Sequence, residues 1–568
     1  MTLRLVMLVG ASLAVTLTTT AHADTASPSP ATSRWPVKVI GKTHTIFAWN
    51  NLSGPGATVP GLANTYDMSL FEWNWGGKQS TFNGAGITTN SNFPLTEGEA
   101  LSNNTHLGLK AELKPGLEAG ALWQFYTVFG NRIVGRVFGE ELPWNNFDRQ
   151  TPTSVVQEHF STDVFQAWLK DTAGELTYHA VFGNFQPELT KKETNFVRLG
   201  SLLYRPPVTN ASFFEKEDRK IETGRHPLRG VDVIVDEAYH EGKHLHGEMF
   251  LGRTKPTPVQ EMDRDVAGTR WGIDVLDGNA GITFVRTEGE RNPTITGERQ
   301  NLWALDGSYA LAKALSIFGV WGHTAYTRTT GTFRDNAWVG GARFLGPRKT
   351  ELKAQYQRVG EDFELMGHHK TEHYPSNFHG LNASMTIPIG KAATLKGVLY
   401  HLHQIDTSTN ADDTVFGDSF FPSVANAKRG GITMYRLSAD YDFGTHDTHL
   451  PQLTAYYEQA QFRKDSPTGA NDIDKTVRSL NVLILQPLIT DLTLELGFRH
   501  VMATGRWQAM RFHHRQDIPE VALSYQRGKN LRATLLYHWY DFVDSIPASA
   551  GRNNYAAQQI LCEVFFAF

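Results

Sequence analysis

The sequence predicts an all-β fold, a single transmembrane antiparallel β-barrel of about 22 strands, within a range of about 18 to 24. Three features of the 568-residue chain support this prediction. Apolar and polar residues alternate with period two from about residue 37 to the end of the chain, as in strands with two different faces. Short turns alternate with long connections. Beyond Ala23, no apolar run approaches the roughly 18 residues that a membrane-spanning helix needs.

Composition excludes several other classes of protein. The chain is 11% aromatic and 20% charged and contains 51 glycines, which argues against both disorder and a collagen-like repeat. Its 54 Lys and Arg residues against 58 Asp and Glu residues give a formal net charge of -4, so we expect no nucleic-acid partner. Cys562 is the only cysteine, so an exported chain has no internal disulfide. A closed, hydrogen-bonded barrel would supply the stability instead.

Residues 1–23 have the features of a removable export signal. Arg4 precedes an apolar stretch from Leu5 to Leu17, and Ala21-His22-Ala23 forms a small-x-small cleavage site. We therefore expect three segments: a signal peptide at 1–23, a short periplasmic N-terminal segment at 24–36, and a transmembrane barrel at 37–568.

Turn positions predict the number of strands. Leu107 and Leu109 alternate with polar residues up to Pro115-Gly116, and Ala121 and Trp123 follow in the same phase, which describes a hairpin. Ten such turns lie at residues 115–116, 171–175, 240–243, 277–279, 311–314, 346–348, 388–391, 444–451, 486–490 and 527–530. The longest connections are residues 50–102, 131–160, 186–228, 361–378 and 406–429. With both termini on the short-turn side, ten turns imply about 22 strands, with short periplasmic turns and long extracellular loops.

The polar phase of the strands carries charges and amides, which suits a water-filled lumen. A soluble β-sandwich with these residues on its outer surface is the alternative that alternation alone leaves open. If the polar phase faces a lumen, it supplies candidates for solute selectivity. These candidates are Arg270, Asp274, Lys353, Gln355, Gln357, Arg436, Asp440, Glu495, Arg499 and Arg532.

The last strand favours the membrane barrel over the sandwich. From Asn554 onward, one phase is apolar up to the final aromatic residue and consists of Ile560, Cys562, Val564, Phe566 and Phe568. In this strand the sequence resembles Gram-negative outer-membrane β-barrel proteins, whose final strand ends in Phe and is recognised by the barrel-assembly machinery. The resemblance implies an integral location in the outer membrane, with outer-membrane lipid and that machinery as partners. A strand edge at the chain end is also a template for strand addition.

The first strand begins too early for a separate N-terminal plug domain, because only residues 24–36 precede it. Any constriction is therefore expected from loops folded into the lumen. The candidate loops are residues 50–102, with Phe71, Trp73 and Trp75, and residues 186–228, where Glu215 to Arg225 mix both signs of charge.

The predicted function is a porin-like channel for small polar solutes. Charges of both signs on the lumen face indicate a weakly selective pore. Two alternatives stay open: an exporter of an anionic polysaccharide, which would line its constriction with arginines, and a barrel sheath around a separate electron-transfer cytochrome. Polysaccharide-export barrels share this size and the lack of a plug, although no motif assigns the chain to them.

No cofactor and no catalytic activity are expected. The chain has no C-x-x-C-H motif for covalent haem, and no local signature singles out a catalytic triple among its 22 histidines. Imidazoles at short spacing can bind a transition metal. His368, His369, His373 and His379 are weak candidates in one loop, and His244 and His246 lie near a short turn. Solvated histidines in a turn or loop are the commoner explanation of both groups.

Overall fold

The fold is known for most of the chain outside the long connections. The computed structural model describes residues 37–53, 65–66, 81–83, 86–88, 94–95, 98–130, 158–185, 187, 228–240, 242–254, 264–289, 298–328, 331–363, 377–406, 430–445, 449–464, 473–507, 510–544 and 554–568. The predicted export signal, the segment 24–36 and most of the two predicted constriction loops lie outside these residues. In the described part, no helix is long and apolar enough to cross a membrane.

Strands account for nearly all of the described structure. The first eleven strands of the main sheet are β1 (Val37–Ser53), β6 (Gly98–Lys114), β7 (Leu117–Gly130), β8 (Glu158–Ala173), β9 (Leu176–Phe185), β10 (Leu228–His240), β11 (Lys243–Arg253), β12 (Arg264–Val275), β13 (Gly278–Gly289), β14 (Arg299–Ala312) and β15 (Leu315–Arg328). The others are β16 (Gly331–Leu345), β17 (Glu351–Val359), β18 (Phe378–Ile389), β19 (Ala393–Gln404), β20 (Gly431–Asp442), β21 (Gln452–Lys464), β22 (Ile473–Ile489), β23 (Leu492–Trp507), β24 (Met510–Arg527), β25 (Leu531–Asp544) and β26 (Tyr555–Ala567).

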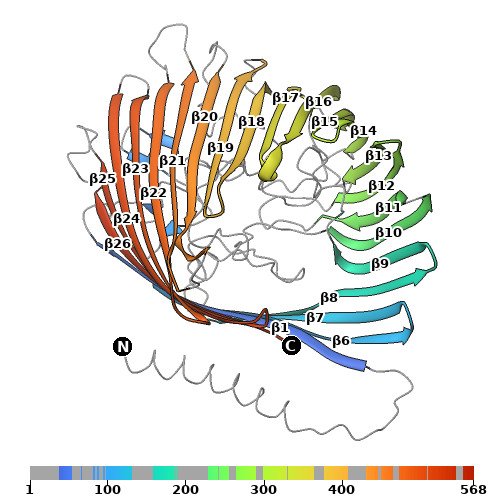
Figure 1. Cartoon of the computed structure of the whole chain (residues 1–568), viewed down its shortest axis with the longest axis horizontal. Helices are drawn as coiled ribbons and strands as arrows, with labels where there is room; N and C mark the ends of the chain where they lie inside the picture. The colour runs from blue at the N-terminus through green and yellow to red at the C-terminus, as the bar shows by residue number, and fades with distance from the viewer. Residues whose placement is uncertain are drawn as a thin grey trace, which may run out of the picture.

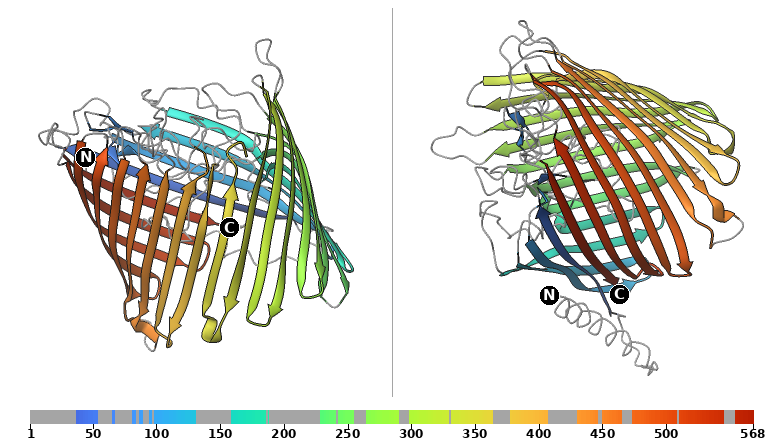
Figure 2. Two further views of the ribbon diagram at one scale, coloured as in Figure 1. Left: turned by 90° about the horizontal axis from the view of Figure 1, so that it is seen from above. Right: turned by 90° about the vertical axis from the view of Figure 1, so that its left-hand side faces the viewer.

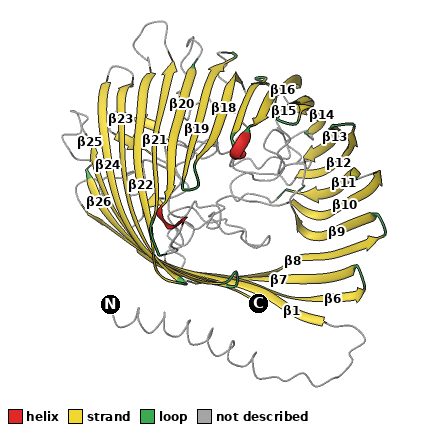
Figure 3. Ribbon diagram, in the orientation of Figure 1, coloured by secondary structure: helices red, strands yellow, loops and turns green. Residues whose placement is uncertain are grey.

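Short elements complete the described fold. Strand β2 (Thr65–Tyr66) pairs with β5 (Pro94–Leu95), and β3 (Thr81–Asn83) pairs with β4 (Gly86–Thr88). Two 3₁₀ turns, η4 (Pro347–Lys349) and η5 (Phe443–Thr445), lie in short turns of the main sheet (Figure 3).

Within the described residues, 22 antiparallel strands form one closed sheet. Each strand pairs with the next one along the chain, and β1 pairs both with β6 and with the last strand, β26. Strands β9 and β10 pair in the same way, so the ring has no open edge there. Figure 1 shows the strands arranged around the ring in chain order, and Figure 2 shows their tilt. The predicted fold class and strand number are confirmed.

The short turns lie at one end of the barrel and the long connections at the other. All ten predicted short turns join consecutive strands at the expected positions. The chain reverses through glycines with positive φ where the turn is tight, as at Gly116 (φ 86°) and Gly528 (φ 61°). The connections β1 to β6, β7 to β8, β9 to β10, β17 to β18 and β19 to β20 are the long ones. We call these two ends the turn end and the loop end.

The apolar phase of the strands faces outward. Trp303 and Leu305, for example, are 48% and 50% exposed on β14, whereas the alternate residues Leu302 and Ala304 are buried. Directly paired residues share one face of an antiparallel sheet, so the exposed phase continues around the barrel. An exposed apolar surface of this extent is suited to lipid contact. It includes Leu107, Leu109, Trp123, Ile282, Trp321, Leu352, Leu437, Leu480, Ile484, Leu496, Phe498, Leu523 and Leu535.

An aromatic girdle marks the edge of the apolar surface toward the loop end. The rings of Phe284 and Trp303 lie 4.4 Å apart, those of Trp338 and Tyr356 5.3 Å, and those of Tyr435 and Tyr457 6.1 Å. Aromatic rings of this kind favour the interface between lipid and water. Nearer the loops, the outward positions become polar and include Arg286, Arg299, Arg334, Arg358 and Arg463.

The C-terminal strand closes the ring. Ile560, Cys562, Val564 and Phe566 lie on the outward phase of β26, which Phe568 continues directly after the strand, while Leu561 and Glu563 are buried. Gly41 and Phe568 exchange both backbone hydrogen bonds, at 3.0 and 2.9 Å. The rings of Phe566 and Phe568 are stacked, with centroids 5.7 Å apart. The role of this face as an assembly signal stays a prediction.

Removal of Phe568 is expected to impair assembly of the barrel without affecting synthesis or export, because two hydrogen bonds of the closing strand pair and one aromatic contact are lost. The measurement is the fraction of heat-modifiable, folded chain on an unboiled gel. Phe568→Tyr is the control, because it keeps the backbone bonds and the ring. An unchanged folded fraction after removal of Phe568 would contradict the role given to the terminal strand.

Candidate functional site: the polar inner wall

All ten predicted lumen residues lie on the inner phase of the wall. On β12, buried Arg270 alternates with exposed Trp271. On β23, buried Glu495 and Arg499 alternate with exposed Leu496 and Phe498. The inner face therefore carries charged and amide side chains among some apolar ones, whereas the outer face is apolar, which is the arrangement of a membrane barrel. The soluble sandwich, in which the polar phase would face bulk water, does not describe this fold.

The predicted arginines do not form a basic ladder, because a carboxylate from a nearby strand lies beside each of them. Arg270 Nη2 lies 2.6 Å from the Asp306 carboxylate, and Arg436 is paired with Glu458. Arg499 Nη2 lies 3.5 Å from Glu520, and Arg532 Nη2 lies 2.9 Å from Glu563. Positive and negative charges thus alternate locally around the wall.

The remaining predicted residues are placed singly rather than as one ring. Lys353 lies over the Phe318 ring, 5.4 Å from its centroid, while Gln355 and Gln357 are buried along the same strand. Asp440 forms an ion pair with Lys396, and further contacts of the predicted residues involve backbone or hydroxyl groups. Asp274 accepts a hydrogen bond from the His244 amide, Asp440 accepts one from the Thr454 hydroxyl, and Glu495 accepts one from the Ser524 hydroxyl.

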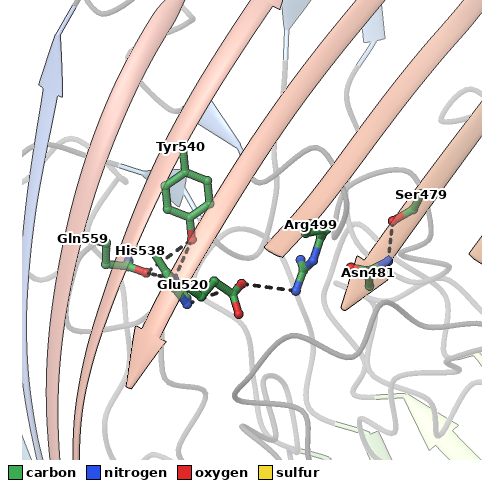
Figure 4. A network of polar contacts seen from close by, with 7 residues as sticks. All are labelled: Ser479, Asn481, Arg499, Glu520, His538, Tyr540 and Gln559. Atoms are coloured by element: carbon green, nitrogen blue, oxygen red, sulfur yellow. Dashed lines mark hydrogen bonds and ion pairs between the residues drawn. The ribbon is translucent and has the colours of Figure 1, made fainter. Parts of the chain in front are cut away.

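A buried polar network connects four neighbouring strands, β23 to β26, and a separate polar pair lies next to it on β22 (Figure 4). Arg499 pairs with Glu520, and Glu520 lies 3.6 Å from His538 Nε2. His538 Nδ1 lies 3.0 Å from the Tyr540 hydroxyl and 3.2 Å from Gln559 Oε1. Beside Arg499, the Asn481 amide donates to Ser479 Oγ at 2.6 Å.

A second cluster joins the last strands to the first. Glu563 on β26 lies 2.7 Å from His44 Nε2 on β1 and 2.9 Å from Arg532 Nη2 on β25. Glu563 is 8% exposed, so its charge is compensated by these neighbours rather than by water. The cluster lies at the seam where β26 meets β1.

Sequence reasoning identified two members of these clusters, Arg499 and Arg532, and missed the others. A signal was available in the final strand, where Gln559 and Glu563 occupy the phase opposite the apolar residues. Such residues are expected on the inner wall of a barrel. The missed residues are His44, Ser479, Asn481, Glu520, His538, Tyr540, Gln559 and Glu563.

Exposure of the inner wall changes from the turn end toward the middle. Near the turns, Lys396 and Asp440 form a 2.8 Å ion pair with side chains 51% and 34% exposed. Farther along the wall, the Arg499 and Glu520 side chains are only 3% and 5% exposed. Two other pairs near the turns, Lys110–Glu118 and Arg343–Glu351, are also substantially exposed. Water therefore reaches the charged wall at the turn end.

Of the four histidines predicted as weak metal ligands in one loop, only His379 lies among the described residues. His368, His369 and His373 lie outside the described residues, whereas His379 on β18 bonds the Tyr356 hydroxyl through Nδ1 at 2.7 Å. Near the short turn, His244 and His246 both contact the Asp236 carboxylate. Across the described ranges, no group of three or more His, Cys, Asp or Glu side chains is placed to hold a metal ion.

The closed antiparallel barrel, its apolar outer surface with an aromatic girdle, and its polar inner wall together define the class of protein. The chain is an integral outer-membrane β-barrel protein of porin-like architecture. The class follows from an even number of strands, short turns at one end and long loops at the other.

No family model matches the chain, and no curated protein matches it either. Solved structures with similar chain paths include Pseudomonas aeruginosa OpdK with vanillate, at 9% identity and a TM-score of 0.34, covering 94% of this chain and 99% of that one. Acinetobacter baumannii OccAB2 has 8% identity and a TM-score of 0.39, covering 94% and 98%. The P pilus usher PapC has 8% identity and a TM-score of 0.36, covering 94% and 99%. The fold assignment depends on the strand pairing described above and not on these likenesses.

Proposed function

We propose that the protein is an outer-membrane channel through which small polar solutes diffuse, with weak selectivity for charge and no catalytic step. The observation that carries the proposal is the pairing of inner-wall arginines with carboxylates on nearby strands. A wall whose arginines are each paired with a carboxylate attracts neither cations nor anions strongly. Polar side chains on the wall replace part of the hydration of a passing solute.

The exposed charges at the turn end support passage of solutes in water. Lys396, Asp440, Arg343 and Glu351 line the inner phase where the side chains are accessible. Farther in, the wall is polar but buried, so the cross-section open to solutes is expected to be smaller there. Residues 50–102 and 186–228 remain the proposed source of the constriction.

Single-channel recording in planar bilayers under a salt gradient tests the proposal. The wild-type barrel is expected to conduct, with a reversal potential near zero. Asp440→Asn removes one negative charge from the wall and should shift selectivity toward anions, whereas Lys396→Gln should shift it toward cations. Arg286→Gln is the matched control, because Arg286 is an exposed charge on the outer face and its removal should leave the reversal potential unchanged.

Two results would contradict the channel proposal. One is a folded barrel that does not conduct, and the other is a reversal potential that neither inner substitution moves. Strong anion selectivity of the wild type would instead favour export of an anionic polysaccharide. The paired arginines argue against that alternative, because a basic constriction would need unpaired positive charge. Stable co-purification of a haem protein would favour a cytochrome sheath, and lipid or peptide hydrolysis by the purified barrel would favour an enzyme.

A further inference from the structure

Two histidines project side by side from the outer face of β19, close to the loop end. His401 and His403 are separated by one residue, so they lie on the same face of the strand, and both are exposed. The intervening Leu402 is buried. His403 is paired across the sheet with His379 on β18, and His401 with Thr433 on β20. We propose that His401 and His403 chelate one Cu²⁺ or Ni²⁺ ion at this outer surface.

The separation of the two imidazole nitrogens suits these metals. His401 Nε2 and His403 Nε2 share a hydrogen bond of 2.9 Å, whose proton a metal ion would displace, and the two rings are perpendicular, at 89°. Imidazole nitrogens lie about 2.0–2.1 Å from a bound metal. If the nitrogen–metal–nitrogen angle is about 90°, the two nitrogens are about 2.9 Å apart, whereas at the tetrahedral angle they are about 3.4 Å apart. Right-angled coordination is typical of square-planar and tetragonal Cu²⁺ and Ni²⁺ sites, and tetrahedral coordination of Zn²⁺.

Thr433 orients one of the two ligands. His401 Nδ1 lies 2.9 Å from Thr433 Oγ1. When Nδ1 donates its proton to this hydroxyl, Nε2 carries the lone pair that a metal needs. A hydrogen bond from the ring nitrogen that does not bind the metal fixes the tautomer and ring orientation of a metal-ligating histidine. Its loss typically lowers the metal affinity 10- to 100-fold.

We expect water molecules to occupy the remaining coordination positions of the ion. No third protein ligand is in place within the described part of the chain, since no group of three ligands is present there. The nearest further imidazole, His379, has its ring centroid 5.7 Å from that of His403 and bonds Tyr356 through Nδ1. Because both histidines are exposed near the polar loop end, an aqueous ion reaches them without crossing the apolar belt.

Titration of the full-length barrel in detergent with CuCl₂ tests the proposal, with bound copper counted after dialysis and its nitrogen coordination read by EPR. Wild type is expected to bind one Cu²⁺ more than His401→Gln/His403→Gln, and that ion should show coupling to two nitrogens. Thr433→Val should weaken its binding about tenfold. The matched control is His244→Gln/His246→Gln, which removes a second His-x-His pair whose Nδ1 atoms contact Asp236. The control should keep the ion.

Equal copper stoichiometry in wild type and His401→Gln/His403→Gln would overturn the proposal. Loss of the ion in the His244→Gln/His246→Gln control, with retention in the first variant, would also overturn it. Folding of each variant is checked by heat-modifiable gel mobility, so an unfolded sample does not enter the comparison. NiCl₂ should give the same order of variants, and ZnCl₂ should bind more weakly than both.

Discussion

Val564→Arg is expected to lower the free energy of unfolding of the barrel by about 2–4 kcal/mol, the cost of a basic side chain near the bilayer midplane. Val564 occupies the middle of the outward apolar run on β26, between Cys562 and Phe566. Its neighbours across the sheet are Ala533 and Thr45, neither of which neutralises a positive charge. The measurement is urea unfolding in lipid vesicles, followed by tryptophan fluorescence.

Val564→Thr is the control for this prediction. Threonine has the same branched shape and adds a hydroxyl but no charge, so the expected loss is much smaller. If Val564→Arg and Val564→Thr unfold at the same urea concentration, the outward phase of β26 does not contact lipid. The assignment of inner and outer faces would then be wrong for this strand.

Arg532→Met is expected to destabilise the barrel by about 3–5 kcal/mol, because it leaves a buried carboxylate without its arginine partner. Glu563 is 8% exposed and lies 2.9 Å from Arg532 Nη2 and 2.7 Å from His44 Nε2. The three residues come from β25, β26 and β1, so the loss is concentrated at the closing seam. Urea unfolding in vesicles measures the change.

A double variant separates the charge effect from the loss of packing. Arg532→Met/Glu563→Gln removes both charges and should be clearly more stable than Arg532→Met alone. Equal stability of the single and double variants would mean that the ion pair contributes nothing and that packing of the Arg532 side chain over Phe565 explains the loss.

The strand number was predictable because turns are local. Tight turns such as Pro115-Gly116 and residues 527–530 have their own sequence signatures. A barrel of n strands with both chain termini at the turn end has n/2 − 1 short turns at that end, so the number of turns gives the number of strands. Side-chain faces were also predictable, because alternation along one strand does not depend on its neighbours. This is why all ten candidate lumen residues lie on the inner phase.

The partners of those residues were not predictable. Whether Arg499 meets Glu520 depends on the register between β23 and β24, and Arg270 meets Asp306 from two strands away. Register shifts such as the one between Leu122 and Trp123 move the pairing by a residue without a clear sequence signature. The proposed pair His401 and His403 was not among the predicted metal candidates, because those candidates lay in loops and turns, whereas these two histidines lie within a strand.

The pairing of buried charges on the inner wall has a consequence for how this barrel tolerates change. On the lipid side, Leu, Ile, Val and Phe are nearly interchangeable, since acyl chains adapt to any of them. On the lumen side, substitution of a paired polar residue leaves its partner on a nearby strand without a hydrogen bond or counter-charge. Random mutagenesis should therefore yield a periodic tolerance profile, permissive at odd positions of β24 such as Val521 and Leu523 and intolerant at even ones such as Glu520 and Ser524.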